Sequence, residues 1–222
     1  MTTKIYPATF AFLSELAENN NREWFQEHKE RYDAAQQNMK GFVQAIIMRL
    51  SEVDPHIHQD INPSKCLFRI YRDVRFSKNK APYKNWLAAG ISVDGRKLDG
   101  PEYYIHVEPK KIFLAVGYWR PNKAHLDLIR QEIDYNAEEL HTALAKGKWK
   151  WTDLGTEDKL VRPPAGYEAD HPHIDILKLK SFTLSSEVPQ ITMESEGALD
   201  AVMEIYTSCL PFKNYIHQAI DQ

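Results

Sequence analysis

In the first fifty residues, hydrophobic side chains recur every three or four positions, which is the period of an amphipathic helix with one buried face. The pattern predicts a helix over 7–20, a short helix over 22–29 and a longer helix over 32–50. Asn21 precedes the second helix, and asparagine is a favoured N-cap because its side-chain oxygen accepts a hydrogen bond from an unpaired helix N–H. We therefore expect this part of the chain to be helical.

From residue 67 the period changes to two. In LFRIYRDVRF, residues 67–76, most hydrophobic side chains share one parity, whereas Arg69, Asp73 and Arg75 share the other with Tyr71. This alternation is typical of a half-buried strand. Further strands are expected within 86–95, 102–108, 111–119 and 181–188. The central part of the chain should therefore form a sheet.

After Pro121 the helical spacing resumes. Helices are expected over 126–133, 137–145, 194–207 and 209–220, with a short helix inside 173–180 and a loop-rich region over 148–172. No crossover helices separate the central strands, so the fold class is α+β: an antiparallel four- to five-stranded meander flanked by N-terminal and C-terminal helices. We expect a single compact domain over 1–222, helical over 1–54, sheet-rich over 65–120 and helical or loop-rich over 121–222.

Composition fits a globular protein of ordinary kind, because 43% of the 222 residues are hydrophobic and 27% are charged. Neither a signal-peptide pattern nor an apolar run long enough to span a membrane is present, so we expect a cytoplasmic protein without a membrane partner. The two cysteines and the histidines of 54–60 and 170–175 do not predict a metal site, and no nucleotide-binding loop or dinucleotide fingerprint occurs. No cofactor and no metal are expected.

Positive charge is concentrated in KCLFRIYRDVRFSKNKAPYKNW, residues 65–86. Seven basic residues and one acid lie between Lys65 and Lys84, so this segment carries +6, and since the whole chain carries −3, the remainder carries −9. Clustered cations repel one another, and an anionic partner would relieve that repulsion. Guanidinium, ammonium and hydroxyl groups are the donors that hold phosphate or carboxylate oxygens.

We therefore expect an anion-binding site, for a phosphate- or carboxylate-bearing small ligand, in this segment. Its candidate residues are Arg69, Tyr71, Arg72, Arg75, Ser77, Lys80, Tyr83 and Lys84. If the strand assignments hold, Tyr104 and His106 could share a sheet face with Arg69, Tyr71 and Arg75. Whether the chain is an enzyme stays open, and Asp73 and His171 are the candidates for proton transfer.

Two other functions fit the same segment. Its cations and aromatic side chains are also typical of modules that bind single-stranded nucleic acid, whose affinity falls steeply with salt. Alternatively, the cations are paired with acids of their own chain, or dock an acidic protein partner, in a structural or interaction protein. The oligomeric state is not predicted by any pattern.

RIYRDVRFSKNKAPYK, residues 69–84, fits the motif R-x-Y-R-D-x-R-F-S-x-x-K-x-P-Y-K. With Asn20, Asn21, Trp24 and Phe25 and the later HPHIDILKLKSF of 171–182, it resembles a widespread bacterial family known only as a domain of unknown function. The resemblance covers nearly the whole chain. It implies one compact domain and carries over no activity, so the roles of residues must come from their chemistry.

Overall fold

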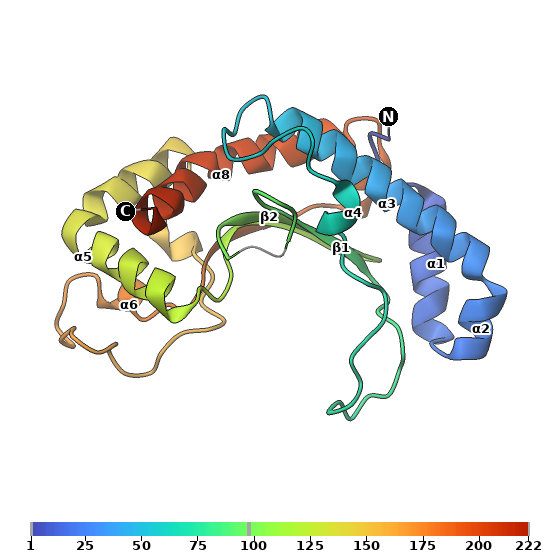
Figure 1. The fold of residues 1–222 in the computed structure, drawn as a ribbon, viewed down its shortest axis with the longest axis horizontal. Helices are drawn as coiled ribbons and strands as arrows, with labels where there is room; N and C mark the ends of the chain where they lie inside the picture. The colour runs from blue at the N-terminus through green and yellow to red at the C-terminus, as the bar shows by residue number, and fades with distance from the viewer. Residues whose placement is uncertain (1, 97–98, 222) are drawn as a thin grey trace. The chain divides into compact units, whose positions relative to one another are not determined.

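The computed structural model of the chain describes residues 2–96 and 99–221 (Figure 1). Its contacts divide the chain into two compact units. The first unit comprises Met1–Lys97, Tyr104–Leu114 and Glu187–Met203, and the second comprises Leu98–Tyr103, Ala115–Ser186 and Glu204–Gln222. This division by contacts does not test the expectation of a single domain over 1–222, which stays a prediction.

The first unit begins with the three expected helices, α1 (Pro7–Glu18), α2 (Arg22–Glu27) and α3 (Lys29–Leu50), followed by the short α4 (Pro63–Cys66). Asn21 caps α2 as predicted, because its Oδ1 accepts a hydrogen bond of 2.9 Å from the backbone N–H of Trp24. The hydrophobic stripe of α3 is buried, which confirms the helical period. The same unit contains α7 (Gln190–Glu194).

The sheet has four strands in the order β1 (Leu87–Ile91), β2 (Glu102–Glu108), β3 (Lys111–Tyr118) and β4 (Phe182–Glu187). Neighbours in the sheet are also neighbours in the chain order of strands, so the sheet is an antiparallel meander. Together with helices at both ends of the chain, it confirms the α+β class and the lower of the two expected strand numbers.

The expected strand over 67–76 is wrong. This part of the chain belongs to a long loop between α4 and β1 (Figure 1), with isolated bridges at Leu67–Ala89 and Tyr71–Tyr83. The returning arm of the loop contains Pro82, which has no N–H to donate, so a continuous ladder cannot form. Its carbonyl oxygen instead accepts from the N–H of Arg72 at 2.9 Å.

The second unit contains most of the remaining helical structure. A single helix, α5 (Lys123–Lys146), replaces the two expected helices and is kinked at Asn136, whose φ of −132° and ψ of 41° are not helical. A 3-10 turn (Trp151–Asp153) and α6 (Ile174–Leu177) follow. The last helix, α8 (Ala198–Ile220), belongs to the first unit up to Met203 and to the second unit from Glu204. It runs through Pro211, where two helices were expected.

Within residues 2–96 and 99–221, no helix combines the length and the apolar character that crossing a membrane requires.

Candidate functional site

The outer part of the long loop, residues 72–81, is called the loop tip. Arg75 donates to Asp73 through Nε at 3.0 Å and Nη2 at 2.6 Å, and this bidentate pair holds the pKa of Asp73 below its usual value. Arg72 donates to the carbonyl oxygen of Ala81 at 3.0 Å, and Lys80 donates to that of Val74, also at 3.0 Å. Three of the predicted ligand-binding cations therefore close the loop on itself.

The two predicted tyrosines hold the loop against the N-terminal helices. The ring of Tyr83 stacks on Phe25 with centroids 3.9 Å apart, and Tyr71 lies 5.5 Å from Tyr83. The side-chain amide of Asn20 pairs with both backbone groups of Tyr83, accepting from its N–H at 3.1 Å and donating to its carbonyl oxygen at 3.0 Å. Tyr83 is thus an anchor of the loop.

At the base of the loop, charged and aromatic side chains gather around the ring of Phe68. The Phe68 cluster consists of Phe68, Lys84, Trp86, Arg96 and Tyr104, together with Arg69, which is included because its charge acts on Lys84; all six residues are in the first unit. The Nζ of Lys84 lies 5.6 Å and the Cζ of Arg96 lies 4.8 Å from the Phe68 centroid. The ring centroids of Trp86 and Tyr104 lie 6.4 Å and 5.8 Å from it, and Lys84 also lies 4.4 Å over Trp86.

The cations of the Phe68 cluster repel one another. The pKa of Lys84 is lowered from its usual value first by burial and then by the charges of Arg69 and Arg96. In the part of the chain that the structure describes, none of these three side chains has a carboxylate oxygen within 4.0 Å. The charge of Arg69 does act on Asp73, where it helps to lower that pKa as the smallest of four causes.

Beside the Phe68 cluster, three side chains of β2 form a line of hydrogen bonds. Tyr104 Oη lies 3.2 Å from His106 Nδ1, and His106 Nε2 lies 3.2 Å from Glu108 Oε2. The other oxygen of Glu108 accepts from Asn85 Nδ2 at 2.8 Å. His106 is 7% exposed and lies against the rings of Trp86 and Phe113, so burial lowers its pKa below the usual value.

The predicted site is thus divided between two places. The Phe68 cluster contains Arg69 and Lys84. The loop tip contains Arg72, Arg75, Lys80 and also Ser77, whose N–H donates to the carbonyl oxygen of Val74 at 3.3 Å. The two tyrosines, Tyr71 and Tyr83, anchor the loop. The expected shared sheet face does not form, because residues 67–76 are not a strand. Tyr104 contacts Phe68, but Tyr71 packs against Tyr83 and Arg75 is paired with Asp73. Sequence reasoning did not single out Arg96, whose only signal was its position just after the Asp94–Gly95 turn.

His171, in the second unit, uses both of its ring nitrogens. Nε2 lies 2.9 Å from Asp134 Oδ1, and Nδ1 accepts from the backbone N–H of His173 at 3.1 Å. Since a carboxylate only accepts, the imidazole proton is on Nε2 and the lone pair of Nδ1 is occupied. This arrangement does not favour His171 as a proton-transfer group.

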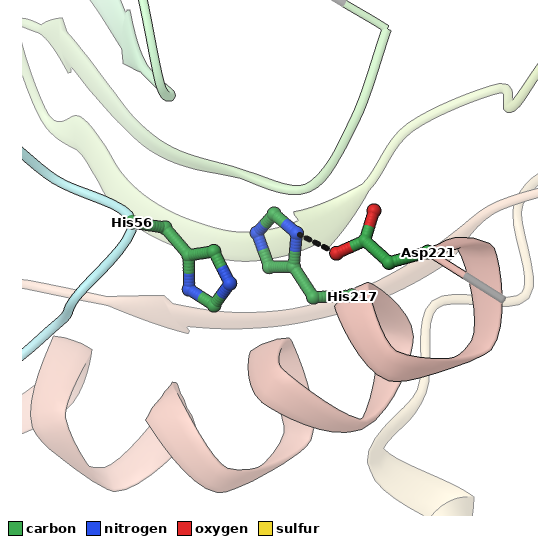
Figure 2. A group of neighbouring side chains, drawn as sticks. All are labelled: His56, His217 and Asp221. Atoms are coloured by element: carbon green, nitrogen blue, oxygen red, sulfur yellow. Dashed lines mark ion pairs between the residues drawn. The ribbon is translucent and has the colours of Figure 1, made fainter.

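Other histidines also pair with acids on their own segment. The Nδ1 of His56, in the first unit, lies 3.1 Å from Asp54 Oδ1. In the second unit His217 forms an ion pair of 3.8 Å with Asp221, one turn further along the chain, which the dashed line in Figure 2 marks. Pairs at this spacing are ordinary helix-end contacts.

The second unit has an open groove of about 760 Å³ beside α5. Its charged side chains are already engaged: the buried Arg130 donates to the carbonyl oxygens of Leu177 and Leu179, Lys123 pairs with Asp127, and Asp134 pairs with His171. In the Phe68 cluster, Arg96 likewise donates to a carbonyl oxygen, that of Leu67, at 3.1 Å. The side chains of Arg69 and Lys84, however, make no hydrogen bond or ion pair within the described residues, which makes that cluster the stronger candidate for a ligand site.

Comparison with protein-family models finds a match over most of the chain. The family model described as "Conserved hypothetical protein (DUF2461)" matches residues 8–215, and the chain belongs to this family. No curated protein and no solved structure matches the chain.

Proposed function

We propose that this member of the DUF2461 family binds a small anionic ligand, one that bears a phosphate or carboxylate group, at the Phe68 cluster. The observation that carries the proposal is that Lys84 and Arg96 both lie over Phe68 and that the charge of Arg69 acts on Lys84. Within residues 2–96 and 99–221, no carboxylate oxygen lies within 4.0 Å of these three side chains. Lys84 and Arg96 are partly buried, whereas Arg69 is exposed. Like charges cost more where burial reduces the screening by water and salt, so the cost falls mainly on Lys84 and Arg96. A bound anion removes that cost, and guanidinium groups offer it paired donors.

The rings of the cluster favour a small anion over a nucleic acid strand. Lys84 lies over Trp86 and Phe68, and Arg96 also lies over Phe68, so these cations already occupy ring faces on which a base would stack. A single strand remains the second candidate because Phe76, at the loop tip, is 96% exposed. Arg75 Cζ lies 5.9 Å over its ring, which leaves the other face of the ring for stacking. The loop tip itself fits the third candidate, internal pairing, since Arg75 is bound to Asp73. A cytoplasmic location remains part of the proposal.

The test is a thermal-shift and calorimetric panel of inorganic phosphate, a nucleoside monophosphate, a dicarboxylate and a short single-stranded oligonucleotide. A ligand at about a hundred times its Kd adds roughly 2.7 kcal/mol of stability and raises the Tm by several degrees. The Arg69→Ala, Arg96→Ala double variant should lose this shift for the small anion.

The matched control is Arg72→Ala, Arg75→Ala, which removes the same two charges from the loop tip. This control should keep the shift, because neither side chain belongs to the Phe68 cluster. Equal loss in both double variants would mean that binding follows net charge alone, and a shift with the oligonucleotide only would favour the second candidate. If no member of the panel changes the Tm, the proposal is wrong.

A further inference from the structure

The three residues of the β2 line stand at alternate positions of one strand. Tyr104, His106 and Glu108 are therefore on the same face of the sheet, where successive side chains can reach one another. Asn85, which precedes β1, fixes the outer end of the line through its 2.8 Å hydrogen bond to Glu108. The inner end is the phenol of Tyr104, whose ring contacts Phe68.

The chemistry of the partners determines where the protons lie. A carboxylate has no proton to donate, so Nε2 of His106 carries the imidazole proton and donates it to Glu108. The Nδ1 of the neutral ring is then an acceptor, and the Tyr104 hydroxyl donates to it. This is the order of a nucleophile or acid, a histidine base and a carboxylate that orients the histidine, with tyrosine in the first place.

We infer that the Phe68 cluster is a proton-transfer site, in which Tyr104 exchanges a proton with the bound anion and His106 takes up the phenol proton. The inference rests on the proposed function and adds a substrate class to it: a phosphorylated or carboxylated compound with an acidic O–H or C–H beside its anionic group. Tyr104 is the catalytic residue and His106 is its base. Glu108 is a positioning residue, held by Asn85.

In the forward step, the ligand's X–H bond breaks and its proton passes to the Tyr104 oxygen, while the phenol proton passes to Nδ1 of His106. The electron pair stays on X, where the positive charges of Arg69, Lys84 and Arg96 stabilise it. The imidazolium that forms is stabilised by Glu108. Return of the two protons restores the site, so the step needs no oxidant or other reactant.

A reactive probe can test both the anion site and the proton transfer from Tyr104 to His106 without knowledge of the natural ligand. The probe 4-(fluorosulfonyl)benzoate bears a carboxylate for the cations and a sulfonyl fluoride for an activated phenol. In the reaction the Tyr104 oxygen forms a bond to sulfur, the S–F bond breaks, fluoride leaves and the phenol proton moves to His106. Uncharged benzenesulfonyl fluoride serves as the comparison probe.

The rate of labelling is measured for each tyrosine by mass spectrometry, with Tyr135 as the internal reference because it is 72% exposed. Base assistance is worth about a hundredfold or more, so Tyr104 should react that much faster than Tyr135 although it is the less exposed of the two. His106→Gln should abolish the difference and leave the Tyr135 rate unchanged.

A second variant keeps the test decisive if His106→Gln does not fold. Glu108→Gln preserves the shape of the side chain and removes its charge. It should slow Tyr104 labelling and shift the pH at which labelling is half-maximal. If the role of Glu108 is purely structural, that pH midpoint stays unchanged. The charged groups that act on His106 are Glu108 and Lys111. Lys111→Gln is therefore measured in parallel.

The two proposals fail in different ways. If the charged probe labels Tyr104 faster than the uncharged probe, and Arg69→Ala, Arg96→Ala removes that preference, both are supported. If Tyr104 reacts rapidly but equally with both probes, the anion site is overturned. If Tyr104 reacts no faster than Tyr135 while phosphate still raises the Tm through Arg69 and Arg96, the proton-transfer inference is overturned and the anion site stands.

Discussion

At the loop tip, Arg75 is bound to Asp73 by two hydrogen bonds, whereas at the base of the same loop Lys84 lies over Phe68 and Trp86 and under the influence of two further cations. Both places carry the charges that the sequence concentrates between residues 65 and 84. In the loop tip those charges are used to close the chain on itself. In the Phe68 cluster, no carboxylate oxygen of the described residues lies within 4.0 Å of Arg69 or Lys84.

Exposure decides how much each arrangement matters. The Arg75 side chain is 77% exposed, and ion pairs of this kind contribute only about 0–1 kcal/mol because water screens them and ordering two long side chains costs entropy. Lys84 is partly buried, where the same charges interact more strongly. A cluster of cations in sequence is therefore informative only when its burial and its partners are known.

Truncation of two phenylalanines should give the largest difference in the free energy of unfolding between the anchored part of the loop and the loop tip. Phe25 is 2% exposed and stacks on Tyr83, so Phe25→Ala should lower the free energy of unfolding by about 3–5 kcal/mol and release the loop from α2. Phe76→Ala, at 96% exposure, should change it by less than about 0.5 kcal/mol. Urea denaturation measures both. Similar losses in the two variants would contradict the assignment of Phe25 as the anchor.

A smaller contrast is expected between two asparagines. Asn20→Ala leaves both backbone groups of the buried Tyr83 without their partner, which should cost about 1–3 kcal/mol. Asn79 makes a comparable 2.9 Å contact to the N–H of Ala81 in the exposed loop tip, where water can replace it, so Asn79→Ala should cost less than about 1 kcal/mol. The reverse order of the two denaturation midpoints would show that the loop is held elsewhere.

Local periodicity predicted most of the fold, and its failures have identifiable causes. The spacing in α3 and the alternation in β2 and β3 agree with the structure because packing against the core sets both patterns. The alternation in 67–76 does not produce a strand, since a strand needs a partner with continuous N–H groups and the returning arm contains Pro82. The helices expected on either side of Asn136 are merged because one kinked residue interrupts α5 without ending it.

The candidate site was predicted in part. Arg69 and Lys84 could be named because they stand in a conspicuous basic segment, and Tyr104 and His106 because they alternate on one strand. Parity does not give the register between a loop and a strand, so the sequence could not separate these residues from Arg72, Arg75 and Lys80. Arg96 stands alone beyond a turn, and only the fold brings it to Phe68.

The smallest effect concerns the ionisation of Lys84 itself. Removing a neighbouring positive charge favours the protonated amine, so Arg69→Gln should raise the pKa of Lys84 toward its usual value. The pKa should stay below that value, because burial is the largest of the three causes that lower it. Arg75→Gln removes one positive charge from the loop tip. It should leave the pKa of Lys84 unchanged, because the partner of Arg75 is Asp73. Titration of reductively methylated, carbon-13-labelled lysines by NMR compares the three proteins. Equal shifts in both variants would mean that Lys84 responds to net charge alone, and the distinction between loop tip and Phe68 cluster would then lose its electrostatic basis.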